Sequence, residues 1–247
     1  MRYLILPFVL AIFAGPGLCD EYSSKEKFLS RLLDKQVEQN ISIERSVSVL
    51  LKRYPGYEEF ILNKAFSNYP KQYRQIIRGA FNANPALSQD IIRLALTHQV
   101  DSCDKVIKTA IKAEPAYADD IVVVASKLHP DDRHHIVRMA LKTKPVMATS
   151  IVNSTLDTYP NDFIEILSMA FDELPEMFST LLNSVFRNHP EKSDAVIKVA
   201  VQNADKQHIR DIIDLAVGSG LDQDAVLESV LKAGADKELV AKWEEKH

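Results

Sequence analysis

The spacing of the prolines constrains the fold of this chain more than any other feature of its sequence. Nine prolines fall on one grid with a period of fifteen residues: Pro55, Pro70, Pro85, Pro115, Pro130, Pro145, Pro160, Pro175 and Pro190. Two grid positions hold Val100 and Asp205 instead, and the pattern continues beyond each of them. The remaining prolines, Pro7 and Pro16, lie in an N-terminal segment of different character. A strict internal period predicts a chain built from repeated structural units.

One repeat, residues 70–84, indicates what each unit folds into. Counting its proline as position zero, apolar residues stand at +3, +6, +7, +10 and +11, which places them on one stripe of an α-helix. Proline suits the first turn of a helix and disfavours helical geometry in the residue before it. Each repeat is therefore expected to form a helix of about eleven residues, roughly 16 Å long, and a tight turn. Because so short a helix is marginal alone, neighbouring helices are expected to stack.

Alternate repeats differ, so the unit is expected to be two helices and thirty residues. Helices that start at 70, 100, 130, 160 and 190 open with polar residues, whereas those at 85, 115, 145 and 175 open with more apolar ones. One layer is therefore expected to be more buried than the other. Position +10 is alanine in most repeats, which is expected to let a neighbouring helix approach closely. Where the proline is missing, Asp101 and Ser102 are expected to cap the helix.

The predicted fold is all-α: a right-handed α-solenoid of fifteen-residue single-helix repeats that pair into thirty-residue helical hairpins. One domain is expected over residues 20–247, after a signal peptide at 1–19. It comprises an N-terminal cap and degenerate repeat at 20–54, repeats at 55–217, and a C-terminal cap at 218–247. The cap helices are expected at about 25–38, 222–233 and 236–245.

The layout resembles the α-solenoid repeat proteins of the tetratricopeptide and HEAT kind, over nearly the whole mature chain. The resemblance is one of architecture, because the tetratricopeptide period is about 34 residues and the HEAT period about 40–47. The chain also resembles uncharacterised secreted bacterial proteins with Ala-x-x-x-x-Pro repeats, a motif that Ala65 to Pro70 and Ala80 to Pro85 show. The resemblance implies a binding or assembly role and carries over no active-site residues.

Residues 1–19 have the pattern of a secretory signal peptide. Arg2 precedes an apolar run at 3–14 that is too short to span a bilayer, and small residues allow cleavage between Cys19 and Asp20. Lipidation of Cys19 is disfavoured because Leu18 is bulky at the position before it, and an uncleaved membrane anchor is the other alternative. The protein is therefore expected to be exported, to the periplasm or the extracellular space, with no integral membrane span in the mature chain.

Charge and cysteine content limit the expected partners and chemistry. The chain has 30 Lys and Arg residues against 34 Asp and Glu residues, a balance that predicts no binding of nucleic acid. Cys103 is the one cysteine left after cleavage. It stands at position +3, where other repeats have Tyr73 and Phe163, so it is expected to be a small buried apolar residue. A reactive thiol or an intermolecular disulfide is the alternative.

Two series of side chains recur at spacings of thirty residues and are the candidate partner-binding residues. The Tyr/His series stands just before alternate helices: Tyr69, His129, Tyr159 and His189. The Tyr/Met series stands two residues into the other helices and includes Tyr117, Met147 and Met177. Side chains repeated in this way line up along a solenoid, so either series is a candidate ridge for contacting a partner. The alternative, which the sequence favours, is that both series pack over the turns or between the layers.

No catalytic or metal-binding constellation is predicted. The densest group of potential metal ligands is His129, Asp131, His134 and His135, but Asp is also favoured in a first helical turn by the helix dipole. The sequence has no Gly-rich phosphate loop, no Gly-x-Ser-x-Gly motif and no Cys-x-x-Cys motif. Neither enzymatic activity nor a cofactor is therefore expected.

These features together predict an exported, non-catalytic helical-repeat scaffold that binds another protein or peptide, or further copies of itself. The alternative is a carrier of a lipid or another apolar small molecule. A groove lined by the Tyr/Met series would favour the carrier. A solvated ridge that bears the Tyr/His series would favour protein binding.

Overall fold

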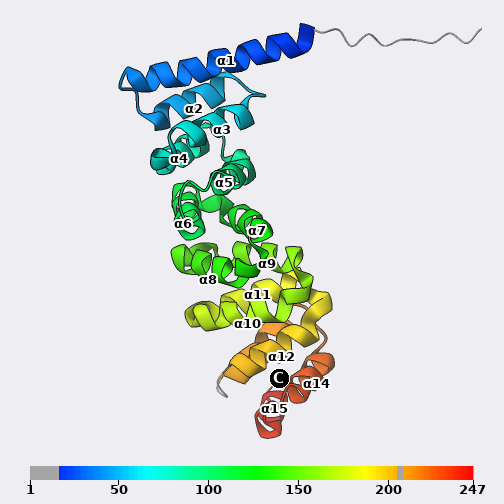
Figure 1. Ribbon diagram of the computed structural model, residues 1–247. Helices are drawn as coiled ribbons and strands as arrows, with labels where there is room; N and C mark the ends of the chain where they lie inside the picture. The colour runs from blue at the N-terminus through cyan, green and yellow to red at the C-terminus, as the bar shows by residue number, and fades with distance from the viewer. Residues whose placement is uncertain (1–16, 205–207, 247) are drawn as a thin grey trace, which may run out of the picture.

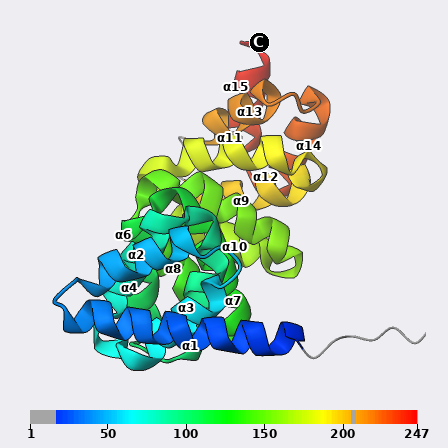
Figure 2. The same ribbon diagram turned by 90° about the horizontal axis from the view of Figure 1, so that it is seen from above.

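The structure is a computed structural model that describes residues 17–204 and 208–246 (Figure 1). These residues form fifteen α-helices and no strand, which confirms the prediction of an all-α chain. The helices follow one another in an elongated stack with α1 at one end and α15 at the other (Figures 1 and 2). The predicted signal peptide lies outside the described residues up to residue 16.

The helices form two layers, because each one packs against the next but one in the chain, and nearly all of them also pack against the next one. The even-numbered layer contains α2 (Ile43–Arg53), α4 (Tyr73–Ala83), α6 (Cys103–Ala113), α8 (Arg133–Thr143), α10 (Phe163–Glu173), α12 (Ser193–Asn203) and α14 (Gln223–Lys232). The odd-numbered layer contains α1 (Gly17–Glu38), α3 (Glu58–Asn68), α5 (Ser88–Thr97), α7 (Ala118–Leu128), α9 (Ala148–Thr158), α11 (Phe178–Asn188), α13 (Ile209–Gly218) and α15 (Lys237–Glu244). This is a helical-repeat-like architecture.

Proline begins the helical part of most repeats, as predicted, but the first turn is a 3-10 helix. These turns are Pro70–Gln72, Pro85–Leu87, Pro115–Tyr117, Pro130–Asp132, Pro145–Met147, Pro160–Asp162, Pro175–Met177 and Pro190–Lys192. The residue before the proline ends one helix and starts the next. The N–H of Tyr69 donates to the carbonyl of Ala65 at 2.9 Å, and the carbonyl of Tyr69 accepts from the N–H of Gln72 at 2.9 Å. This bond to the third residue along makes the turn 3-10.

Four connections among the described residues have no proline and use a left-handed backbone instead. The residues concerned are Asn40 (φ 62°), Gln99 (φ 50°), Gly220 (φ 92°) and Gly234 (φ 101°). After α5, the N–H of Val100 bonds back to the carbonyl of Ala95 at 3.4 Å, which is the Schellman arrangement. The Asp101 carboxylate accepts the N–H of Ser102 at 2.8 Å, whereas the Ser102 side chain, contrary to the prediction, forms no capping bond.

The buried stripe lies where the apolar period places it. Every +6/+7 pair from Ile76 and Ile77 to Val196 and Ile197 is at most 1% exposed. The +10 alanines are 0% exposed: Ala65, Ala80, Ala95, Ala110, Ala125, Ala140, Ala170 and Ala200. Helices of both layers bury this stripe equally. Outside the stripe the odd-numbered layer is the more buried one, as predicted, since position +8 is half-buried at Val123 and Asn153 but exposed at Lys108 and Arg138. The helices from α6 to α12 have eleven residues each, as expected.

The two ends of the stack depart from the repeat. The first helix, α1, begins at Gly17 rather than near residue 25 and so runs across the predicted cleavage point. The helices α14 and α15 lie within two residues of their predicted positions. Trp243 of α15 is 4% exposed, and its Nε1–H donates to the Asp214 carboxylate at 2.7 Å. Of the helices described, none has the length and apolarity needed to cross a membrane.

Gly79 marks the closest approach between two helices of the even-numbered layer. It stands at position +9 of its repeat, on the side of α4 that faces α2. A Cβ atom placed on Gly79 would lie 2.3 Å from the carbonyl oxygen of Glu44, which belongs to the backbone of α2. A backbone atom cannot move aside as a flexible side chain can, so α2 and α4 can pack this closely only with glycine here.

Replacing Ala140 by Leu is expected to lower the free energy of unfolding by roughly 1–3 kcal/mol, because the added atoms overpack a fully buried contact. Urea unfolding followed by circular dichroism measures this loss. Ala116, which is exposed in a 3-10 turn, provides the control, and its replacement by Leu should leave the stability unchanged within about 0.5 kcal/mol. Equal stability of Ala140→Leu and the wild-type chain would contradict close packing at position +10.

Gly79→Ala is expected to destabilise the protein, although alanine is favoured over glycine in helices by about 1 kcal/mol. The clash with the Glu44 carbonyl must move α4 away from α2, at a cost of roughly 1–3 kcal/mol beyond that gain. Gly218→Ala is the matched control, because a Cβ atom there meets nothing within 4 Å. Thermal unfolding should show a lower midpoint for Gly79→Ala and an equal or higher one for Gly218→Ala. The reverse order would show that the two helices are not in close contact.

Candidate binding surfaces

The N-terminal members of the Tyr/His series are half-buried at the ends of helices. The Tyr69 hydroxyl donates to the Asp34 carboxylate of α1 at 2.8 Å. Burial, together with this bond to a carboxylate, raises the pKa of Tyr69 to about 12. His129 is half-buried at the equivalent place after α7. Tyr69 therefore links α1 to the end of α3.

The later members of the Tyr/His series pack in the same way. The Tyr159 ring lies 3.7 Å from the guanidinium of Arg133, which also forms an ion pair with Asp162. His189 is only 4% exposed, and its ring packs edge-on against Phe163 at 5.4 Å between centroids. The contacts of Tyr69, Tyr159 and His189 are those of the packing alternative. A role of this series in contacting a partner stays a prediction.

The Tyr/Met series closes the 3-10 turns of the odd-numbered layer. Tyr117, Met147 and Met177 are each the last residue of such a turn, and each is half-buried against the hydrophobic core. The N–H of Met147, for example, donates to the carbonyl of Lys144, the residue before the proline, at 3.0 Å. These side chains therefore cover the ends of the buried stripe, and their predicted role in holding a ligand remains a prediction.

The histidines of the potential metal cluster face different helices. His135 Nε2 lies 2.9 Å from Asp104 of α6, whereas His134 Nε2 lies 3.6 Å from Glu165 of α10. Adjacent positions on a helix point about 100° apart, so the two rings pair with neighbours on opposite sides of α8. Within residues 17–204 and 208–246, no group of three or more His, Cys, Asp or Glu side chains is arranged to hold a metal ion.

The Cys103 thiol is half-buried at the start of α6. Burial raises its pKa to about 11, and the nearby carboxylates of Asp104 and Asp132 act in the same direction. A thiol with so high a pKa is almost entirely protonated at neutral pH, and only the thiolate reacts readily. The environment of Cys103 therefore suppresses its reactivity.

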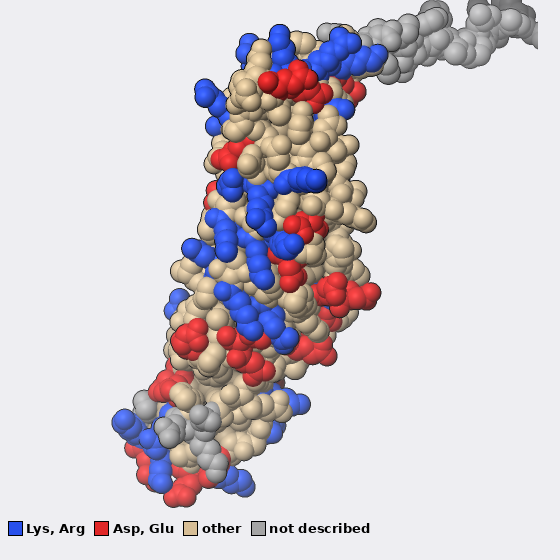
Figure 3. All heavy atoms as spheres, turned by 60° about the vertical axis from the view of Figure 1, so that its left-hand side comes forward, with Lys and Arg blue, Asp and Glu red and all other residues tan. Residues whose placement is uncertain are grey.

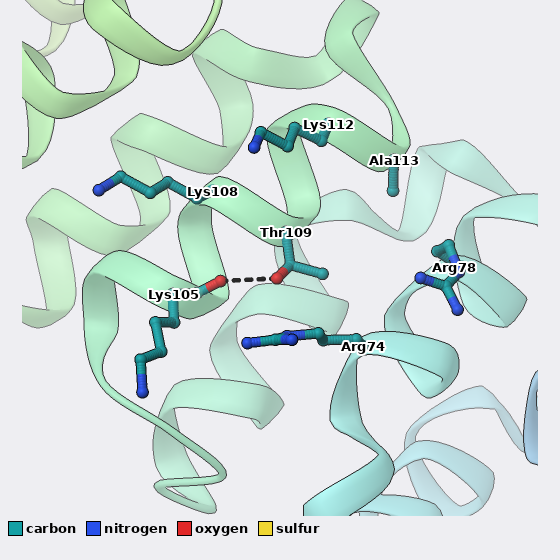
Figure 4. Close-up of a pocket in the computed structure, with 7 residues that line it drawn as sticks. All are labelled: Arg74, Arg78, Lys105, Lys108, Thr109, Lys112 and Ala113. Carbon is teal, nitrogen blue, oxygen red and sulfur yellow. Dashed lines mark hydrogen bonds between the residues drawn. The ribbon is translucent and has the colours of Figure 1, made fainter.

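Lys and Arg side chains gather on the outer face of the even-numbered layer, above a zone where Asp and Glu predominate (Figure 3). The first hollow on this face has a volume of about 450 Å³, and its wall includes Arg74 and Arg78 of α4 with Lys105, Lys108 and Lys112 of α6 (Figure 4). The second hollow, of about 530 Å³, is lined by Lys108 and Lys112 again, with Arg138 and Lys142 of α8. We call the surface formed by these seven side chains the basic face.

The cations of the basic face differ in how far they are neutralised within the chain. Some pair with a carboxylate of the preceding connection or of the neighbouring helix in the same layer: Arg78 with Glu44 at 3.0 Å, Lys105 with Asp101 at 3.0 Å, and both Arg138 and Lys142 with Glu173, the latter at 2.8 Å. The ammonium of Lys142, with the nearby Arg138, lowers the pKa of Glu173. Lys108 and Lys112 are exposed and form no ion pair with any described residue. They stand where the two hollows meet.

The basic face is not evident from the net charge of the chain, which is negative. It is evident from the positions that Lys and Arg residues occupy within the fifteen-residue repeat. Arg78, Lys108 and Arg138 all occupy position +8, and Lys112 and Lys142 both occupy position +12. Helices of one layer stack in parallel, so residues that share a position thirty residues apart form a row. A count of charges for each position of the repeat would have found the row.

Comparison with protein-family models, with curated proteins and with solved structures found no match to this chain.

Cys103 is expected to react with iodoacetamide on the order of a hundredfold more slowly at pH 8 than a thiol of ordinary pKa. The rate should rise steadily as the pH approaches 11, because the thiolate appears only as the pH nears the raised pKa. The measurement uses the chain from residue 20, in which Cys103 is the one cysteine, and the same chain unfolded in urea is the control. Equal rates in the folded and unfolded chains would contradict the protected environment.

Proposed function

We propose that the protein is a non-catalytic helical-repeat scaffold that binds another protein along the outer face of its even-numbered layer. The observation that supports this most is the pair of adjoining hollows on that face, where Lys108 and Lys112 are exposed and unpaired within the described residues. Two unpaired cations where the hollows meet, with five further cations beside them, suit a negatively charged partner. A stack of helices also provides an extended surface for such a partner.

The proposal includes the finer architecture and the location of the protein. We take the stack to be a right-handed α-solenoid in which fifteen-residue repeats pair into thirty-residue hairpins. The proline period and the resemblance to α-solenoid repeat proteins support this, as do contacts between each helix and its next two neighbours. The signal-peptide pattern of residues 1–19 supports export to the periplasm or the extracellular space.

A scaffold accounts for the Tyr/Met series better than an apolar carrier does. Tyr117, Met147 and Met177 contact the hydrophobic core and are half-buried there, so much of their apolar surface is already covered. The hollows of the basic face have walls rich in charge, which suits a polar partner. The carrier remains the alternative, and the same experiment tests it.

A photo-crosslinking amino acid in place of Thr109, which lines the first hollow, is expected to capture a protein from the exported fraction of the native cells. The matched control has the crosslinker in place of Lys127, which is exposed on α7 of the other layer. Mass spectrometry should identify one protein that is enriched at position 109 over position 127. Stoichiometric lipid without any protein would instead favour the carrier, and equal capture at both positions would contradict binding along this face.

A further inference from the structure

The charges around the two hollows indicate the sign of the ligand. Seven Lys and Arg side chains line the hollows, against one carboxylate, that of Asp104. Asp104 is itself 2.9 Å from His135, and the seven cations outnumber it. The chain as a whole has more acidic than basic residues, so this local excess of cations is opposite in sign to the average. An anion is the ligand that such a surface attracts.

The uncharged part of the walls narrows the class of anion. Besides His135, the remaining lining is Thr109, Ala113, Met139 and Thr143, and no Phe, Tyr or Trp side chain is among the described residues that line either hollow. Sites for single-stranded nucleic acid combine a basic groove with several aromatic rings on which successive bases stack. His135 is a single ring and lies against Asp104, so it does not provide such a series. A flat lipid bilayer does not enter a hollow. The small and apolar side chains between the cations instead leave room for a polypeptide backbone whose side chains carry carboxylates.

The spacing of the rows matches one conformation of a polypeptide. Helices in contact pack with their axes about 8–10 Å apart, so cations at one repeat position on α4, α6 and α8 recur at about that interval. A polyproline II helix has three residues per turn and rises about 9 Å in each turn. An acidic residue at every third position of such a segment therefore presents one carboxylate to each helix of the basic face.

We propose that the basic face binds an acidic polypeptide segment in a polyproline II conformation that runs across α4, α6 and α8. The inference rests on the proposed function and names the chemistry of its partner. Lys108 and Lys112 contribute most, because no carboxylate of the described chain has to release them first. Arg78, Lys105, Arg138 and Lys142 already pair with carboxylates of the chain, so they contribute less to binding than Lys108 and Lys112 do.

The test uses a fluorescent peptide of repeated Glu-Pro-Pro triplets, about fifteen residues long, titrated into the chain from residue 20 and followed by anisotropy. Binding is expected at low ionic strength and should weaken as salt screens the charges. A Lys-Pro-Pro peptide should not bind. A Glu-Gly-Gly peptide has the same charges but a flexible backbone, so it should bind several-fold more weakly because it must be ordered on binding. Equal affinity for the Glu-Pro-Pro and Glu-Gly-Gly peptides would overturn the assigned conformation.

The double variant Lys108→Glu with Lys112→Glu is expected to lower the affinity for Glu-Pro-Pro at least about tenfold, because two attractions become two repulsions. The matched control is Lys127→Glu with Lys237→Glu, which makes the same change of net charge at exposed lysines of the odd-numbered layer. It should keep the affinity within about twofold. Both doubles should melt at the wild-type temperature. Equal losses in the two doubles would overturn the site, since the wild-type binding would then depend only on net charge.

Three further probes test the class of anion: a single-stranded oligonucleotide, a sulfated oligosaccharide and vesicles that contain phosphatidylglycerol. Tighter binding of any of them than of the Glu-Pro-Pro peptide would overturn the assignment to a polypeptide, as would no binding of the peptide. The assignment of an acidic partner can fail while the proposal of a protein-binding scaffold holds. This would be the case if the same protein crosslinked at position 109 equally well in the wild-type chain and in the chain with Lys108→Glu and Lys112→Glu. The absence of any crosslinked protein would count against the scaffold itself.

Discussion

Burial of one apolar stripe on each helix is the interaction on which the structure depends. Helices of eleven residues are too short to be stable in water alone, so each must cover its +6/+7 pair and its +10 residue, most often alanine, against neighbouring helices. Ile151 and Val152 show the result, since both are fully buried. The small residue at +10 sets how closely neighbouring helices approach, and at Gly79 the approach is closer still. Everything on the outer faces follows from this internal arrangement.

The connections between helices keep the stripe in register. A proline keeps the residue before it out of the helical conformation and then starts a 3-10 turn, so successive repeats enter their helices in a similar way. In connections without a proline, a residue with a left-handed backbone ends the helix in a Schellman arrangement. Gln99 does so without the freedom of glycine, which costs free energy that the neighbouring packing must offset. Helices that follow either kind of connection pack into the same two layers.

The fold was predictable from the sequence because the signals repeat. The proline grid and the apolar stripe predicted the helices, their length and the small buried residue at +10. The 3-10 form of the first turn and the early start of α1 depend on backbone geometry that composition does not report. The candidate site was harder. For Tyr69 and Tyr159 the sequence favoured packing over a partner-binding ridge, and their contacts with Asp34 and Arg133 are packing contacts, while a role in contacting a partner stays a prediction. The row through Lys108 is visible only once helices of one layer are known to be neighbours.

The pattern of contacts between helices has a mechanical consequence. In repeat arrays each unit interacts with its nearest neighbours, and the main helix–helix contacts within residues 17–204 and 208–246 all join helices one or two places apart in the chain. Tension applied to the two ends would therefore extend the chain elastically at first, through small changes of angle between successive helices. Larger forces would peel off single helices from whichever end is weaker. A protein built in this way can change its length gradually while its middle repeats stay folded.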